Sequence, residues 1–275
     1  MVSTEQVRAE LMAHAPDGAT PGKTVWVGLQ LQHQPQWHTY WKNSGDSGQP
    51  TTLSWTLPTG VLAGDVAWPL PKKIPIGNLA NYGYDDTVLL PVPLTITPDF
   101  KPSPITPELV IRLQASWLVC KQECVPQDGD FTLSLPVKGS TALNNADFQA
   151  AFQAQPQALS GQSQITLENN RLKLTVANLP AALQGKTLEF FPEIPEVIET
   201  AAPWTQAWQG AVWTASVPIA THRGASPASL PLVLVADAAG RRQGFSSTAT
   251  VSGTWPAQAA PGAAAPAPAA LPAPP

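Results

Sequence analysis

The chain has 275 residues, which is enough for two ordinary domains with separate hydrophobic cores. Charged residues make up 12%, about half the usual share, and there are 31 prolines, a composition that favours a β-rich extracytoplasmic protein over a cytosolic helical one. The net charge of −4 comes without a basic cluster, which argues against a nucleic-acid-binding surface, and no apolar run reaches the roughly 18 residues of a membrane-spanning helix. Residues 1–5 have neither the charged nor the apolar region of a signal peptide, so we expect a mature domain from a longer precursor.

Residues 1–137 have the alternating apolar and polar pattern of β-strands. The alternation is clear over residues 25–31 and predicts a strand there. Residues 87–96 form a second predicted strand that contains Pro91 and Pro93. Because proline has no backbone N–H to donate, two prolines in one strand predict a sheet edge or a bulge.

The strongest strand pattern covers residues 109–119 and leads directly to Cys120. A turn is predicted at residues 127–130, where Gln-Asp-Gly-Asp precedes a further strand at 131–137. Many short strands separated by proline and glycine turns indicate a β-sandwich. We therefore expect an immunoglobulin-like domain over residues 1–137.

The β pattern stops at residues 138–160, where we expect a linker with a short helix at 142–155, capped by Ser140 or Thr141. A second β domain is predicted over residues 161–255, with a hairpin turn at 168–171. Its expected strands are 165–167, 172–176, 187–191, 211–218, 230–236 and 244–251. The predicted fold class is thus all-β, with two sandwiches joined by a short helical linker.

The last segment, residues 256–275, consists almost entirely of alanine and proline. Such a composition cannot build a core and favours extended polyproline II structure. We predict a disordered, semi-rigid spacer to a further part of the natural protein.

Only two cysteines occur, Cys120 and Cys124, and three interpretations compete for them. A structural disulfide is the first, but so short a loop contributes only about 2 kcal/mol, against roughly 3 kcal/mol for a 15-residue loop. A copper-binding module is the second, since two thiolates can share a soft ion such as Cu(I). A closed zinc site needs two more ligands, and the four histidines have no suitable spacing.

Reversible redox exchange is the third interpretation, because a short dithiol loop can open and close without disturbing the fold. One thiolate attacks a partner disulfide and the other resolves the mixed disulfide. Lys121 favours a thiolate and Glu123 opposes it, so the local charges do not decide the matter. The spacing alone favours redox exchange but leaves all three interpretations open.

Three blocks of the sequence resemble the N-terminal domains of DsbD-like and ScsB-like protein-disulfide reductases. They are Trp-His-Thr-Tyr-Trp-Lys-Asn-Ser-Gly-Asp-Ser-Gly at 37–48, Asn-Tyr-Gly-Tyr at 81–84, and the strand-to-cysteine block at 117–126. Together they cover most of residues 5–137 in the order that the family shows. The second half resembles the longer ScsB-type head, which has an additional β domain.

The resemblance implies a periplasmic thiol:disulfide exchange module tethered to the inner membrane, working without a cofactor through a redox-active Cys120–Cys124 disulfide. Electrons are expected to come from the transmembrane domain of the full-length protein and to pass to thioredoxin-fold partners, such as a disulfide isomerase or an ScsC-like protein. It further implies that Cys124 attacks the partner and that Cys120 resolves the mixed disulfide.

The same resemblance implies a cap loop that shields the cysteines, matched in position by residues 76–86. Its candidate shielding residues are Asn81, Tyr82, Gly83 and Tyr84, with a tyrosine expected in the role that phenylalanine has in DsbD. The carboxylates of Asp85 and Asp86 are candidates for proton transfer at the thiols, as is His38. We expect no metal at this site.

Overall fold

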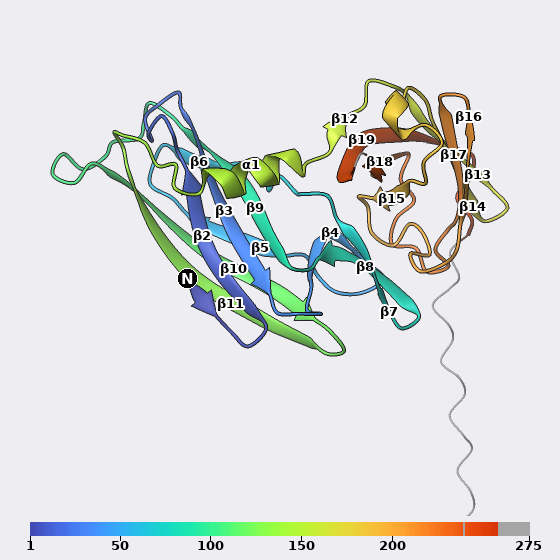
Figure 1. Ribbon diagram of the computed structural model, residues 1–275, viewed down its shortest axis with the longest axis horizontal. Helices are drawn as coiled ribbons and strands as arrows, with labels where there is room; N and C mark the ends of the chain where they lie inside the picture. Colours follow the sequence, from blue (N-terminus) through green and yellow to red (C-terminus); the bar gives the residue numbers. More distant parts are fainter. Residues whose placement is uncertain (239, 258–275) are drawn as a thin grey trace, which may run out of the picture.

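The computed structural model describes residues 1–238 and 240–257, which form two β units with one short α-helix, α1 (Asn145–Gln153), between them (Figure 1). The all-β prediction is confirmed. Residues 258–275 of the predicted spacer lie outside the described residues. Within the described part of the chain, no helix is long and apolar enough to cross a membrane.

Three sheets make up the first unit. A five-stranded sheet has the order β1-β2-β3-β9-β6, and three-stranded sheets have the orders β11-β10-β5 and β4-β8-β7. The strands are β1 (Val2–Ser3), β2 (Val7–His14), β3 (Thr24–His33), β4 (Thr39–Gly45), β5 (Thr52–Thr56), β6 (Val61–Ala63), β7 (Lys72–Ile76), β8 (Leu79–Tyr84), β9 (Thr87–Ile96), β10 (Glu108–Cys120) and β11 (Cys124–Pro136).

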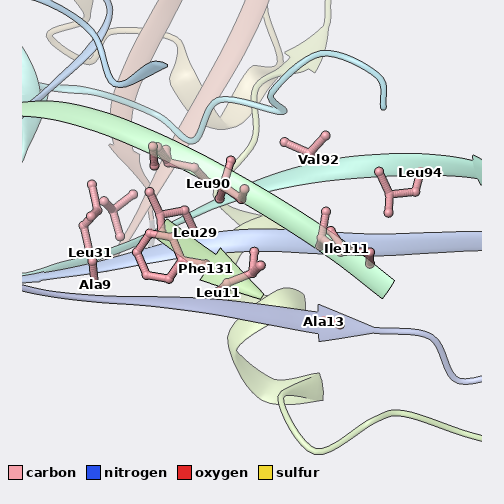
Figure 2. Packing of buried hydrophobic residues seen from close by; sticks show 14 of the residues in the cluster. Ala9, Leu11, Ala13, Leu29, Leu31, Leu90, Val92, Leu94, Ile111 and Phe131 are labelled. Atoms are coloured by element: carbon pink, nitrogen blue, oxygen red, sulfur yellow. The ribbon is translucent and has the colours of Figure 1, made fainter. Parts of the chain in front are cut away.

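The core of the first unit lies between the five-stranded sheet and the β10–β11 hairpin. Along β10, buried and exposed residues alternate as the sequence predicts, so one face of the strand is apolar and fully covered. Figure 2 shows Leu29, Leu90 and Val92 of one sheet near Ile111 and Phe131 of the other. Two layers with a shared apolar interior form a sandwich.

The two prolines of β9 lie where the strand is an edge, as their missing N–H groups predict. β9 pairs with β3 along its length, but β6 reaches only Leu94–Ile96 on the other side. Beyond β6, loop amides donate to the outward carbonyls of Pro91 and Pro93, from Ala67 N and Gly64 N at 2.8 Å each. At this edge the two prolines accept hydrogen bonds through their carbonyls, so their missing N–H groups leave no bond unmade.

The predicted turn at residues 127–130 is wrong. β11 runs unbroken from Cys124 to Pro136, and Gly129 pairs with Ala115 of β10. The chain reverses at residues 121–123 instead, between the two cysteines. Pairing with thirteen residues of β10 holds the Gln-Asp-Gly-Asp segment extended, so tertiary context overrides its local turn preference.

The helix is shorter than predicted, and it begins differently. Its N-cap is Asn144, which makes no side-chain capping bond, while Thr141 joins a β-bridge with Ala15. Phe148 is fully buried against Met12 of β2 and against β9, so α1 packs on the outer face of the first sheet.

The second unit is one eight-stranded sheet with the order β15-β18-β19-β13-β14-β17-β16, and β12 pairs with β19. The strands are β12 (Gln157–Ala158), β13 (Ser163–Glu168), β14 (Arg171–Val176), β15 (Glu189–Pro192), β16 (Thr205–Gln209), β17 (Val212–Pro218), β18 (Ser229–Ala238) and β19 (Arg241–Ser252), with a 3-10 turn η1 (Ala181–Leu183).

Both ends of this sheet contribute to one apolar core, which includes Leu174 and Trp213 at one end and Leu232 at the other. The predicted hairpin turn is present, with Asn169 and Asn170 at φ 50° and 58°. Asparagine tolerates this left-handed conformation better than most residues, which explains the tight β13–β14 connection.

Candidate functional site: a disulfide at the end of a hairpin

The two cysteines face each other across the end of the β10–β11 hairpin. Cys120 is the last residue of β10, Cys124 is the first residue of β11, and the two are register partners. A disulfide joins them with an S–S distance of 2.05 Å. Within the connecting turn, the Lys121 amide donates to the Glu123 carbonyl at 3.0 Å.

The two cysteines differ sharply in accessibility. Cys120 is 3% exposed and belongs to the buried residues of the first unit, whereas Cys124 is exposed. Because the two residues are register partners, their side chains lie on the same face of the hairpin, and the difference comes from their neighbours: Cys120 lies between Cys124 and the bridged residue His38, whereas Cys124 belongs to β11, the edge strand of its sheet. An incoming thiol or disulfide therefore meets Cys124 first.

A backbone bridge joins the disulfide to the segment that carries His38. The His38 amide donates to the Cys120 carbonyl, and the Cys120 amide donates to the His38 carbonyl, both at 3.0 Å. This pairing brings β4, which begins at the next residue, against the end of the hairpin. Residues 82 positions apart in the sequence thus form one site.

Tyr40 is the tyrosine whose side chain contacts the disulfide. Its hydroxyl oxygen lies 3.8 Å from Cys124 Sγ, and its ring packs edge-on against His38 with centroids 5.2 Å apart. Burial raises the pKa of Tyr40 to about 12, so the hydroxyl stays protonated at neutral pH and is able to donate a hydrogen bond. A Cβ at Gly48 would lie 2.1 Å from the Tyr40 ring, so only glycine leaves room for it.

Side-chain contacts between polar groups connect His38 to Asn81 of β8 and on to Ser47. Asn81 Nδ2 lies 3.4 Å from His38 Nε2, and the Ser47 hydroxyl donates to Asn81 Oδ1 at 2.9 Å. Burial lowers the pKa of His38, while Asp85 acts in the opposite direction, so the ring is neutral at pH 7. If the Asn81 amide donates to Nε2, the single ring proton is on Nδ1.

The segment predicted as a cap loop is a β-hairpin, formed by β7 and β8. Its tyrosines have partners other than the disulfide: Tyr82 packs against Phe191 with centroids 4.9 Å apart, and the Tyr84 hydroxyl donates to the Pro69 carbonyl at 2.8 Å. Gly83 lets β8 approach β4, since a Cβ there would lie 2.0 Å from the Thr39 carbonyl oxygen. Of the four candidates, Asn81 is the one whose side chain reaches the group of residues around the disulfide.

The structure groups the two candidate aspartates with Lys72. Asp85 forms an ion pair with its ammonium group, and Asp86 Oδ2 lies 3.7 Å from Lys72 Nζ. The Asp86 side chain is 90% exposed, and its backbone carbonyl accepts a hydrogen bond from His33 Nδ1 at 2.9 Å. Among the contacts of the described residues, none joins either carboxylate to a cysteine, so their role in proton transfer stays a prediction.

The surface beside Cys124 is hollowed over the hairpin turn. Trp37, Lys121, Gln122 and Glu123 line a shallow hollow of about 400 Å³. One aromatic ring, one amide and charges of both signs thus line a hollow next to the turn that ends at Cys124. In the described part of the chain, no group of three or more His, Cys, Asp or Glu residues is arranged to hold a metal ion.

The sequence places Tyr40 within the 37–48 block, but no role was predicted for it. A usable signal was the run His-Thr-Tyr-Trp at 38–41, which places polar and aromatic groups on one short strand. Which of the chain's tyrosines reaches the sulfur depends on the His38–Cys120 bridge, and local pattern does not reveal that pairing.

Comparisons with known proteins agree with this geometry. Residues 8–136 match the family described as thiol:disulfide interchange protein DsbD, N-terminal. The chain is similar to the crystal structure of the N-terminal periplasmic domain of ScsB from Proteus mirabilis, with a TM-score of 0.63 and 18% identity over 91% of this chain and 96% of that chain. At this identity the likeness shows the fold, which extends across both β units. A search among curated proteins gave no match.

Proposed function

We propose that residues 8–136, which match the family described as thiol:disulfide interchange protein DsbD, N-terminal, are the thiol:disulfide exchange module of a larger periplasmic protein-disulfide reductase. It passes electrons from a transmembrane domain of the full-length protein to oxidised thioredoxin-fold partners. The observation that carries the proposal is the pairing of an exposed Cys124 with a buried Cys120 in one hairpin disulfide.

The first step is attack by Cys124 on a partner disulfide. In the reduced module, the Cys124 thiolate forms a bond with one partner sulfur, and the partner's own S–S bond breaks. The second partner sulfur leaves as a thiolate and takes up a proton. Tyr40 supports this step because its neutral hydroxyl, close to Cys124 Sγ, is a donor that stabilises the thiolate.

The second step releases the partner. Cys120 loses its proton and attacks Cys124 Sγ, so the intramolecular disulfide forms again and the mixed disulfide breaks. The first partner sulfur departs as a thiolate and is protonated. The partner has gained two electrons and two protons, and the module has lost the same number. A dithiol in the transmembrane domain then reduces the pair by the reverse steps.

A trapping experiment tests this assignment. Reduced Cys120→Ala chain is mixed with an oxidised thioredoxin-fold disulfide isomerase, quenched with acid and analysed by non-reducing electrophoresis and mass spectrometry. We expect a mixed disulfide through Cys124 that accumulates because Cys120, the resolving thiol of this chain, is absent. The matched Cys124→Ala variant should give at least about tenfold less, since its remaining thiol is buried.

The same material separates the alternatives. If neither variant forms a mixed disulfide, the wild-type pair does not exchange across a range of glutathione buffers, and the reduced pair binds Cu(I) tightly, the chain is a copper-binding module. If the disulfide neither exchanges nor binds copper when reduced, it has a purely structural role.

A further inference from the structure

Strand β8 connects the disulfide to the second β unit through two successive residues. Asn81 contacts His38 beside the disulfide, while the next residue, Tyr82, packs edge-on against Phe191 of β15 with centroids 4.9 Å apart and planes at 72°. Tyr82 is 2% exposed, and its hydroxyl shares a hydrogen bond with the Thr200 side chain. Neighbouring residues of a strand point to opposite faces, so β8 has one face at the site and one at the second unit.

Strand β4 repeats this arrangement. Tyr40 contacts Cys124, while Trp41 packs edge-on against Phe191 with centroids 6.1 Å apart. The Trp41 and Tyr82 rings also pack edge-on, with centroids 6.5 Å apart. The three rings therefore pack against one another where the two units meet. In Figure 1, β4 and β8 lie between the first sandwich and the second unit.

Two polar contacts join β4 to the second unit. The Asn43 amide donates to the Pro192 carbonyl at 2.7 Å, and Lys42 Nζ lies 2.6 Å from Glu193 Oε1. Asn43 is 2% exposed, so its bond is shielded from water. β4 and β8 pair with a register shift between Tyr40 and Gly45, which leaves this stretch of β4 without continuous ladder support from its neighbour.

Phe191 belongs structurally to the first unit although its strand belongs to the second. It lies 1% exposed within the core cluster of the first unit, together with Val233 and Val235 of β18. The preceding residue, Phe190, points the other way into the core of the second unit. The second unit thus inserts one aromatic side chain behind the strands that cover the disulfide.

We infer that Phe191 is a positioning residue for the disulfide: by holding Trp41 and Tyr82, it fixes Tyr40 and Asn81 against Cys124 and His38. The second unit is therefore part of the redox site's support, and its docking sets how strongly the Cys124 thiolate is stabilised and how well it is covered. The role of Phe191 in electron transfer rests on the proposed function. Its effect on the pKa of the Cys124 thiolate can be measured whether or not that function is correct.

The experiment measures the pH dependence of Cys124 alkylation by iodoacetamide in the full chain, in a Cys120→Ala background so that one thiol reports. Four variants form a cycle: the background, Tyr40→Phe, Phe191→Leu and the double variant. We expect Tyr40→Phe to raise the thiolate pKa by about one unit. Phe191→Leu should raise it by about half a unit or more, and the double variant should show little beyond Tyr40→Phe alone.

Phe190→Leu is the matched control, because it makes the same substitution in the neighbouring residue and faces the core of the second unit. It should leave the thiolate pKa within about 0.2 units of the background. Circular dichroism confirms that each variant is folded. Additive shifts in the cycle, no shift in Phe191→Leu, or an equal shift in Phe190→Leu would each overturn the inference.

A second experiment reverses the charges of the Lys42–Glu193 ion pair between the two units and leaves the aromatic core unchanged. Glu193→Lys opposes Lys42 and should shift the thiolate pKa in the same direction, while the Lys42→Glu, Glu193→Lys double variant should restore it. The control is Glu168→Lys, which breaks the exposed pair with Lys173 in the β13–β14 hairpin. Failure of restoration contradicts the inference. Because alkylation needs no protein partner, these outcomes are independent of the trapping experiment.

Discussion

The hydroxyl of Tyr40 lies 3.8 Å from Cys124 Sγ, and this side-chain contact joins β4 to the disulfide. The tyrosine reaches the sulfur because the His38–Cys120 bridge sets β4 against the end of the hairpin. Its ring is buried beside the disulfide and its hydroxyl offers a proton donor, so the contributions of the ring and of the hydroxyl can be separated by substitution.

Tyr40→Phe retains the ring and removes the donor, whereas Tyr40→Ala removes both. We expect Tyr40→Phe to leave the reduction of the disulfide by glutathione within about threefold of wild type, because the ring still fills the buried space beside the disulfide. Tyr40→Ala should accelerate it by about tenfold or more, because removal of the ring opens the buried side of the disulfide to the attacking thiol. Stopped-flow thiol assays under identical buffers measure both rates, and equal rates for the two variants would contradict a shielding role for the ring.

Gly48→Ala should displace Tyr40. The added Cβ would lie 2.1 Å from the ring at a φ of +93°, so the substitution combines backbone strain with overpacking and should cost about 3 kcal/mol. Gly22→Ala is the matched control, because its φ is +81° but nothing lies within 4 Å of the new methyl group. It should cost only about 1 kcal/mol. Urea unfolding gives both values, and equal losses would refute the predicted clash.

Reduction of the disulfide should leave the fold intact. The loop between the cysteines is so short that its chain-entropy contribution is about 2 kcal/mol, and the nearby residues Trp117 and Val119 are held by the core of the first unit rather than by the disulfide. We expect the urea midpoint to fall modestly on reduction while the far-ultraviolet circular dichroism spectrum is retained. Loss of the spectrum at pH 7 without denaturant would show that the disulfide is structural.

Stability should fall as the pH falls below about 6.5, partly because of His33. Burial lowers its pKa to about 4, while Thr39 Oγ1 and the Asp86 carbonyl each lie 2.9 Å from its ring nitrogens. Since the unfolded chain binds the proton more readily, the stabilisation is complete above pH 6.5 and is lost as the pH falls toward 4, up to about 3 kcal/mol.

The test compares the unfolding free energy of wild type and His33→Gln at pH 7 and pH 5. The substitution lowers stability at pH 7, but its pH dependence should be smaller, because one titrating group with a depressed pKa is gone. His38 contributes in the same direction and remains in both proteins. An equal fall in both proteins would exclude His33 as a source of the acid sensitivity.

The sequence correctly predicted the strands in which apolar and polar residues alternate, because that alternation determines which face is buried. β10 and β9 match the predicted strands closely, and the Asn169–Asn170 turn follows from the tolerance of asparagine for positive φ. The Gln-Asp-Gly-Asp segment was misassigned as a turn because cross-strand pairing along the whole of β10 outweighs local preference.

The site was predictable only where its residues are close in the sequence. Cys120 and Cys124 are four residues apart and were identified from spacing and from the blocks around them. The contacts of Tyr40 and Phe191 span sequence separations of 84 and more than 100 residues, so local pattern does not reveal which residues they meet. The tyrosines that sequence reasoning chose, Tyr82 and Tyr84, have their backbone in the expected place but direct their side chains elsewhere.

The most direct measurement of the central claim is the stoichiometry of exchange. Reduced wild-type chain is mixed with an equimolar oxidised thioredoxin-fold protein, quenched with acid, alkylated and analysed by intact-mass spectrometry. The account predicts that each Cys120–Cys124 disulfide formed is matched by one partner disulfide reduced, with a transient adduct through Cys124. A partner that stays oxidised while the pair stays reduced, in a mixture where glutathione disulfide readily oxidises the pair, would contradict it.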